Sequence, residues 1–237
     1  MIVTAGRDAV VISGIRDFYP EHVFDCGQAF RWNRDKRGYV GVVRDKVVRA
    51  VYREGDGASV RGASVRSRSM GGTSRGASMS GALVGGTSPG GTLALENCTL
   101  DHYHHIWRHY FDLDRDYGQI KEELSSDPVM KEAVRYGWGM RVLNQDPWEI
   151  LISFILSANN NIARIKGIIE RLSEKYGEEI RWEGNAYYTF PSPEALCRAG
   201  EEDLRVCGCG YRGPYVKKTA RMVSEGLISP GGLRELP

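Results

Sequence analysis

Hydrophobic and polar positions in part of the first hundred residues have the pattern of β-strands. Runs rich in valine and tyrosine occupy residues 39–43 and 46–52, which are joined at Arg44-Asp45, and apolar and polar residues alternate over residues 92–98. Successive side chains of a strand point to opposite faces, so the alternation over residues 92–98 indicates a strand with one buried face. We expect these three segments to form one antiparallel sheet.

After residue 100 the apolar spacing changes to that of helices. Proline is favoured at the first position of a helix, where its missing N–H costs nothing, and it follows a turn or capping residue at four places. These places predict helix starts at Pro128, Pro147, Pro193 and Pro214. Asp146 and Glu149 also have the spacing of a capping box around the second of these starts.

The longest apolar stripe follows three consecutive asparagines at positions 159–161. It repeats at intervals of three and four residues and comprises Ile162, Ile165, Ile169, Leu172 and Tyr176. The stripe is expected to pack inward, with Arg164 and Arg171 on the other side of the helix. The whole pattern predicts an α+β protein, with an N-terminal antiparallel β-sheet domain over residues 1–105 and an all-α domain over residues 106–237.

Composition separates residues 57–91 from the rest of the chain. This segment contains ten glycines and eight serines and carries +4 from its arginines with no acid. Such a composition cannot offset its ordering entropy, so we predict a disordered insertion in a surface loop, with an arginine-bearing tether for DNA as the alternative. The net charge is +2, so the remainder of the chain carries −2. The basic balance is therefore no evidence for a nucleic-acid partner.

The lack of a targeting signal in the sequence and its cysteine usage indicate an intracellular protein. The sequence has no run of 18 apolar residues and no signal-peptide core, so no membrane partner is expected. Its five cysteines, an odd number, fit reduced thiols better than a disulfide framework. We expect a cytoplasmic or nucleoid-associated protein, nuclear in a eukaryote, that is a monomer.

Hydrogen-bond donors gather at two of the predicted helix starts. Asn159 and Arg164 flank one start, and Tyr211 and Arg212 precede the other at Pro214. Amides and guanidinium groups can pair with base edges, while the positive end of a helix favours phosphate. Taken alone, three asparagines are more often a helix cap and loop than a reader of bases. We assign Asn160 and Asn161 mainly to capping.

Four motifs occur in order along the chain. They are Gly27-Gln28-Ala29-Phe30-Arg31-Trp32, Asn144-Gln145-Asp146-Pro147, Ser157-Ala158-Asn159-Asn160-Asn161-Ile162-Ala163-Arg164 and Gly210-Tyr211-Arg212. Together they resemble the motifs of the 8-oxoguanine DNA glycosylase/AP lyases of the helix-hairpin-helix superfamily. The resemblance spans most of residues 1–54 and 92–228. It implies base-excision repair of duplex DNA that contains oxidised guanine opposite cytosine, without a cofactor.

The resemblance also implies a role for each matching residue. The backbone carbonyl of Gly27 is expected to accept the proton that oxidised guanine, unlike guanine, carries on N7. Asn159, Arg164 and Arg212 are expected to contact the estranged cytosine, and Tyr211 to wedge beside it.

The catalytic lysine of the family lies in a Gly-rich hairpin, with an essential aspartate further on, and both follow the matching region. We expect that hairpin to lie beyond residue 237 and therefore assign no catalytic residue in this chain. Lysine attack at the sugar C1′, Schiff-base formation and β-elimination make up the complete reaction that the resemblance implies. The alternatives are a non-catalytic remnant that binds damaged DNA and a non-functional gene fragment.

Three further sets of residues invite chemistry. Four histidines, His102, His104, His105 and His109, include a pair with zinc-binding spacing, but a packed surface helix is favoured over a metal site. Cys207 and Cys209 are closer together than a zinc or redox pair requires and are interpreted as small buried thiols. A relocated nucleophile is conceivable at Lys166, Lys217 or Lys218, although none has an obvious cause of a lowered pKa.

Overall fold

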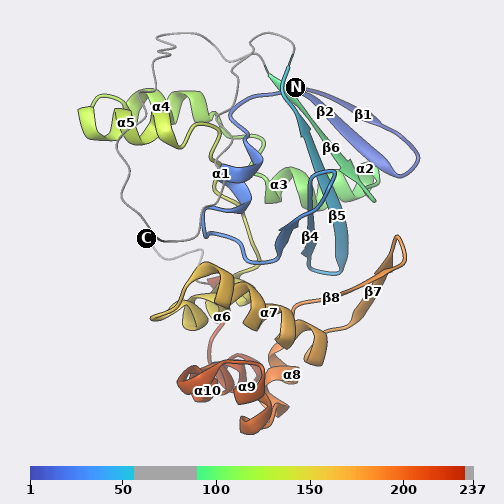
Figure 1. Cartoon of the computed structure of the whole chain (residues 1–237), viewed down its shortest axis with the longest axis vertical. Helices are drawn as coiled ribbons and strands as arrows, with labels where there is room; N and C mark the ends of the chain where they lie inside the picture. Colours follow the sequence, from blue (N-terminus) through green and yellow to red (C-terminus); the bar gives the residue numbers. More distant parts are fainter. Residues whose placement is uncertain (56–89, 233–237) are drawn as a thin grey trace, which may run out of the picture.

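The computed structural model describes residues 1–55 and 90–232 and has an antiparallel sheet followed by a helical region (Figure 1). The sheet has six strands in the order β1-β2-β6-β5-β4-β3, all paired antiparallel. Their bounds are β1 Ile2–Ala5, β2 Ala9–Ile15, β3 Trp32–Arg34, β4 Tyr39–Val43, β5 Lys46–Arg53 and β6 Gly91–Glu96. The predicted sheet is therefore confirmed, and β1, β2 and β3 extend it.

Gly91 marks where the predicted insertion overlaps the sheet. It is the first residue of β6, and an added Cβ atom there would lie 2.3 Å from the hydroxyl oxygen of Tyr52. A side chain at that position would displace the Tyr52 ring, so this glycine belongs to the strand packing rather than to a flexible linker. Gly90 is also described, whereas the remainder of the predicted insertion, 57–89, lies outside the described residues.

Helices occupy most of the chain after β6. They include a continuous helical segment with one π-helical turn, made of α2 Leu100–His102, η1 Tyr103–Trp107 and α3 Arg108–Tyr110. The other elements are α1 Pro20–Phe24 in the sheet region, then α4 Tyr117–Leu124, α5 Pro128–Tyr136, α6 Pro147–Ser157, α7 Ile162–Tyr176, β7 Glu179–Trp182, β8 Asn185–Tyr188, α8 Pro193–Arg198, α9 Glu201–Val206, η2 Gly210–Arg212 and α10 Gly213–Ser224. Three predicted proline starts are confirmed, and α10 begins one residue before Pro214.

Among the described residues, two large hydrophobic cores and a small third cluster hold the sheet and the helices together. The small cluster packs Val40, Val42 and Val47 of the sheet against β7 and β8. The first is rich in aromatic residues, with Trp32 stacked on Phe24 at 4.2 Å between ring centroids and Trp107 fully buried beside them. The second joins α6 and α7 to α8, α9 and α10 through residues such as Leu156, Ile168 and Val216. Complete burial of a large apolar side chain contributes roughly 1.5–3 kcal/mol, so each core supports its own half of the molecule.

The stripe predicted along α7 is correct except at its first residue. Ile165, Ile169 and Leu172 are buried, and Ile168 joins them. Ile162 is 42% exposed and does not belong to the helical core. It lies at the first turn of α7, where the helix faces the loop that contains Gly27. This residue therefore contacts the sheet region rather than the helical core.

A hairpin between α7 and α8 reaches back to the sheet (Figure 1). Arg49 on β5, only 6% exposed, donates hydrogen bonds to Asp35, Glu96 and Glu183, and its guanidinium carbon lies 4.6 Å from the ring centroid of Trp182 on β7. Since Glu183 and Trp182 belong to the hairpin, Arg49 attaches the helical region to the sheet.

Candidate nucleic-acid interface

The three asparagines form the tight connection between α6 and α7. The Asn161 side chain caps α7 by accepting a hydrogen bond from the backbone N–H of Arg164 at 3.0 Å, and the amide of Asn160 donates to the carbonyl of Leu156 at 2.9 Å. The capping roles predicted for both residues are confirmed. Asn159 is exposed and has a φ of 48°, a left-handed conformation that asparagine tolerates well. Its side chain is therefore left available at the surface.

Arg212 ties the second motif to this connection. Its Nε atom donates to the carbonyl of Ala158 at 2.8 Å, and its Nη2 atom donates to the carbonyls of Ala158 and Asn159, the latter at 2.9 Å. The residue is 4% exposed. The sequence predicted an Arg212 guanidinium that is accessible to cytosine. It did not predict these hydrogen bonds to backbone carbonyls. The two motifs, more than fifty positions apart, thus form one surface.

Tyr211 lies on the open side of that surface. Its ring is 4.4 Å from the guanidinium carbon of Arg212, and its hydroxyl donates to the carbonyl of Ala158 at 3.2 Å. The residue is nonetheless 60% exposed. Arg164 is also exposed, in the first turn of α7. An exposed aromatic ring and an exposed guanidinium beside a helix N-terminus can together meet bases and phosphates.

Gly27 lies against the same helix. Its φ is 90°, and an added Cβ atom would lie 3.1 Å from the Cδ1 atom of Ile162. The neighbouring Gln28 holds the loop in place, because its amide donates to the carbonyls of Val23 at 2.8 Å and Arg141 at 2.7 Å. The structure therefore brings Gly27 to the first turn of α7, next to the asparagine connection.

A buried ion pair lies behind this loop. Arg31 and Glu149 have side chains that are 7% and 14% exposed, with Nη1 and Oε2 3.8 Å apart, and Arg31 also donates to the carbonyl of Tyr188. The predicted capping box is wrong in one half, since Asp146 caps α6 but Glu149 is buried beside Arg31. Burial raises the pKa of Glu149 to about 7, against the lowering effect of Arg31 and a smaller raising effect of Asp146.

We expect the Glu149→Gln variant to show a shallower pH dependence of unfolding free energy between about pH 4.5 and 7. The folded carboxyl has the higher pKa and binds its proton more tightly than the unfolded one, so this group makes stability fall as pH rises through that window. Denaturant unfolding of both proteins at pH 5, 6, 7 and 8 measures the difference. Glu170→Gln, at an exposed site on α7, is the control. Identical slopes for Glu149→Gln and the unmodified chain would contradict this expectation.

The lysines considered as nucleophiles are held in different ways. Lys166 donates to the carbonyl of Trp32 at 2.8 Å, Lys217 donates to the carbonyl of Ala199 at 2.9 Å, and Lys218 is exposed. Sequence reasoning missed Lys121 on α4, whose pKa is lowered by burial despite its ion pair with Asp17. The Lys121 Nζ atom also lies 3.0 Å from the ring centroid of Trp138.

The other sets of reactive side chains have structural surroundings. Cys207 and Cys209 are buried, as predicted, and burial raises the pKa of the Cys209 thiol to about 11. His105 pairs with the carboxylate of Asp101 at 3.3 Å. Across residues 1–55 and 90–232, no three His, Cys, Asp or Glu side chains are grouped so as to hold a metal ion.

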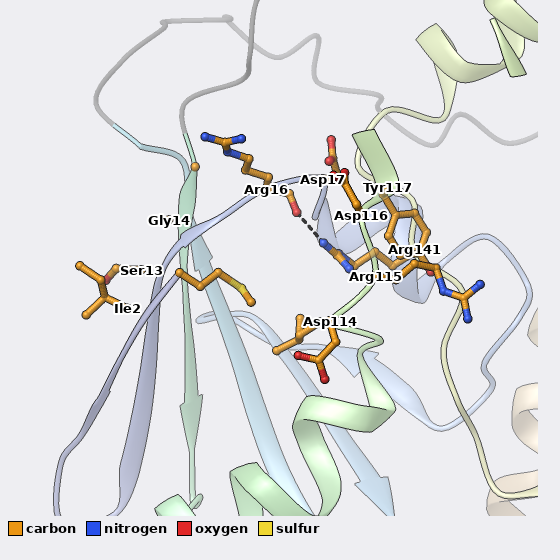
Figure 2. Close-up of a pocket in the computed structure, with 13 residues that line it drawn as sticks. Ile2, Ser13, Gly14, Arg16, Asp17, Asp114, Arg115, Asp116, Tyr117 and Arg141 are labelled. Carbon is orange, nitrogen blue, oxygen red and sulfur yellow. Dashed lines mark hydrogen bonds between the residues drawn. The ribbon is translucent and has the colours of Figure 1, made fainter. Parts of the chain in front are cut away.

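A cavity of about 550 Å³ opens at the other end of the sheet, beside β2 and the start of α4 (Figure 2). Its lining contains the charged residues Arg16, Asp17, Asp114, Arg115, Asp116 and Arg141. Arg141 donates to the carbonyl of Arg16 at 2.9 Å. The lining thus holds three arginines and three aspartates, and none of the predicted DNA-contacting residues lines the cavity. The surface around α7 is therefore a separate feature.

In the described part of the chain, none of the helices combines the length and apolar character needed to cross a bilayer.

Both halves of the chain match known protein families. Residues 10–151 match the N-terminal domain of 8-oxoguanine DNA glycosylase, and residues 152–234 match the HhH-GPD superfamily of base excision DNA repair proteins. These matches divide the chain at a different point from the predicted boundary at residue 105, which remains a prediction.

Individual relatives agree with these matches. An N-glycosylase/DNA lyase of Saccharomyces cerevisiae is 49% identical over 85 residues, which cover 35% of this chain and 23% of the relative. A relative from Arabidopsis thaliana, N-glycosylase/DNA lyase OGG1, is 39% identical over 109 residues, covering 46% of this chain and 29% of the relative. The chain thus aligns with less than a third of the length of either curated relative.

Solved structures extend the similarity to the whole chain. The Clostridium acetobutylicum 8-oxoguanine glycosylase/lyase, in complex with double-stranded DNA containing cytosine opposite to 8-oxoG, has a TM-score of 0.80 at 33% identity. That similarity covers 100% of this chain and 69% of the Clostridium chain. The family match covers more than half of the chain and agrees with the observed sheet and helices. The chain belongs to the 8-oxoguanine DNA glycosylase family of base excision repair proteins.

Proposed function

We propose that this chain recognises 8-oxoguanine paired with cytosine in duplex DNA, as the recognition part of an N-glycosylase/DNA lyase. The observation that carries the proposal is the convergence of three sequence-distant segments on the first turn of α7. Gly27 packs against Ile162, and Arg212 holds the connection that contains Asn159. The solved relative bound to DNA with cytosine opposite 8-oxoG supports this choice of substrate.

Recognition begins with the strand that bears the lesion. An enzyme that acts on a base must take it out of the stack, which costs a few kcal/mol. Gly27 admits the extruded base because it has no side chain and adopts a φ of 90°. Its carbonyl accepts the N7 proton that distinguishes oxidised guanine from guanine. A base without that proton leaves the carbonyl unpaired, which opposes its binding.

The opposite strand needs a different set of groups. Cytosine, left without its partner, presents acceptors that guanidinium and amide donors can satisfy. Asn159 and Arg164 are exposed at the N-terminus of α7 and supply these donors, with Arg212 behind them. Tyr211 fills the gap beside the cytosine with its exposed ring.

The family's reaction, which we propose for the whole protein, displaces the oxidised base through lysine attack and then cleaves the strand by β-elimination. Among residues 1–55 and 90–232 we assign recognition groups and no catalytic residue. We further propose that the protein acts as a monomer in the compartment that holds the DNA, the cytoplasm or nucleoid of a prokaryote or the nucleus of a eukaryote.

We expect binding of a lesion-containing duplex to be weak and strongly dependent on salt. Each phosphate contact contributes a slope of about −0.9 to the dependence of log affinity on log salt concentration. Contacts at the starts of α7 and α10 should therefore reduce affinity roughly tenfold or more between about 50 and about 200 mM salt. Fluorescence anisotropy with duplexes containing 8-oxoguanine or guanine opposite cytosine tests the proposal. Equal affinity for the two duplexes would refute the proposal, and affinity unchanged by salt would refute the phosphate contacts.

A further inference from the structure

Lys166 joins the loop that contains Gly27 to the helix that carries Arg164. Its Nζ atom donates to the carbonyl of Trp32 at 2.8 Å and lies 3.5 Å from Oδ1 of Asp25. Asp25 precedes Gly27 by two residues, and Trp32 follows it by five. One ammonium group on α7 therefore contacts both ends of the loop.

Both ends of the loop are themselves fixed to the sheet. Trp32 is fully buried and begins β3, and Asp25 accepts a hydrogen bond from the hydroxyl of Tyr39 on β4 at 2.6 Å. The Lys166 side chain is 22% exposed, so its hydrogen bond is only partly screened by water. The contacts therefore fix α7 relative to the sheet and not merely to a movable loop.

Helix geometry places Lys166 close to the residues proposed to contact the lesion and the opposite base. Ile162 lies four residues earlier on the same face of α7 and contacts Gly27, while Arg164 lies between them in sequence. The Gly27 carbonyl, proposed to contact the lesion, lies in the sheet region, and Arg164, proposed to contact the opposite base, lies on α7. Lys166 joins these two parts. A base pair has a fixed width, so a change in the separation of the two groups weakens the hydrogen bonds that depend on it.

We propose that Lys166 is a positioning residue that sets the separation between the lesion-facing carbonyl of Gly27 and the opposite-base donors at the start of α7. It acts through Asp25 and the carbonyl of Trp32 and does not touch DNA. This role rests on the proposed function. It also accounts for a lysine that the sequence offered as a conceivable nucleophile.

The test compares Lys166→Met with Lys175→Met. Both remove one charge from α7, but Lys175 pairs with Asp203 at the far end of the helix. The readout is the ratio of dissociation constants for guanine and 8-oxoguanine duplexes, each with cytosine opposite. We expect Lys166→Met to lower this ratio roughly three- to tenfold, as for one lost hydrogen-bonded contact, and to change affinity for the undamaged duplex no more than Lys175→Met does. Lys166→Arg should restore most of the ratio.

Two further measurements separate positioning from folding. Asp25→Asn weakens the same contact from the loop side at a residue that is half exposed, so it decides the question if Lys166→Met does not fold. Combined with Lys166→Met, it should produce little additional loss of the ratio. A ratio unchanged in Lys166→Met and in Asp25→Asn would overturn the positioning role. A ratio near one in the unmodified chain would instead overturn the proposed function, and this role with it.

Discussion

Replacing Arg212 with alanine is expected to lower both the stability of the chain and its preference for cytosine opposite a lesion or gap. The side chain is 4% exposed and hydrogen-bonds the carbonyls of Ala158 and Asn159. Its removal leaves those carbonyls without a charged donor, which we expect to cost on the order of 2–4 kcal/mol of unfolding free energy. The asparagine connection then loses its attachment, and the preference for cytosine falls by ~1–3 kcal/mol.

Arg164→Ala provides the matched comparison. Arg164 is exposed and its side chain holds no part of the fold, so its loss should leave unfolding free energy within about 0.5 kcal/mol. The cytosine preference should nevertheless fall by ~1–3 kcal/mol if the bidentate contact forms. Chemical denaturation and binding to duplexes with each of the four opposing bases measure both quantities. Equal weakening against all four bases would reassign Arg164 to a phosphate contact and Arg212 to a role in stability alone.

The second prediction is that the 237-residue chain does not react covalently with DNA. It should form no borohydride-trappable adduct with a duplex that contains 8-oxoguanine. An amine nucleophile needs a lowered pKa and must lie within contact distance of the sugar carbon. Lys166 and Lys217 donate to backbone carbonyls, and Lys218 is exposed. Lys121 has a lowered pKa, but it pairs with Asp17 in a different region from Gly27. None of these four satisfies both conditions.

Trapping is a sharper assay than release of the base, because a contaminating host glycosylase can release 8-oxoguanine. The chain, a lesion duplex and borohydride are incubated together and the products are separated by denaturing electrophoresis. We expect no band of the chain's mass plus DNA above background. A stoichiometric adduct that disappears in Lys121→Met, Lys166→Met, Lys217→Met or Lys218→Met would show that the chain carries its own nucleophile.

Local patterns predicted the regular elements of the fold because the physical causes are local. Runs of strand-favouring residues over 39–43 and 46–52 predicted β4 and β5, alternation over residues 92–98 predicted β6, and proline at helix starts predicted α5, α6 and α8. The hairpin of β7 and β8 was missed. Its turn at Glu183-Gly184 has positive φ at both residues, and Glu-Gly is a weaker signal for such a turn than Asn-Gly or Asp-Gly.

The candidate site was predicted in part, because motifs identify residues but not their surroundings. The sequence singled out Asn159, Arg164 and Arg212, and it assigned the capping asparagines correctly. It did not reveal that Arg212 is buried against the backbone or that Lys166 contacts the Gly27 loop. Both contacts join segments more than fifty residues apart, and no local spacing encodes such a pairing.

The recognition of cytosine by the surface around α7 is the central claim, and one measurement tests it most directly. The unmodified chain is titrated against four duplexes that differ only in the base opposite a stable abasic-site analogue, so that contacts to the lesion base play no part. Donors from Asn159 and Arg164, on a connection that Arg212 holds in place, predict the tightest binding opposite cytosine, by ~1–3 kcal/mol over the other bases. Equal affinity for all four duplexes would contradict the account.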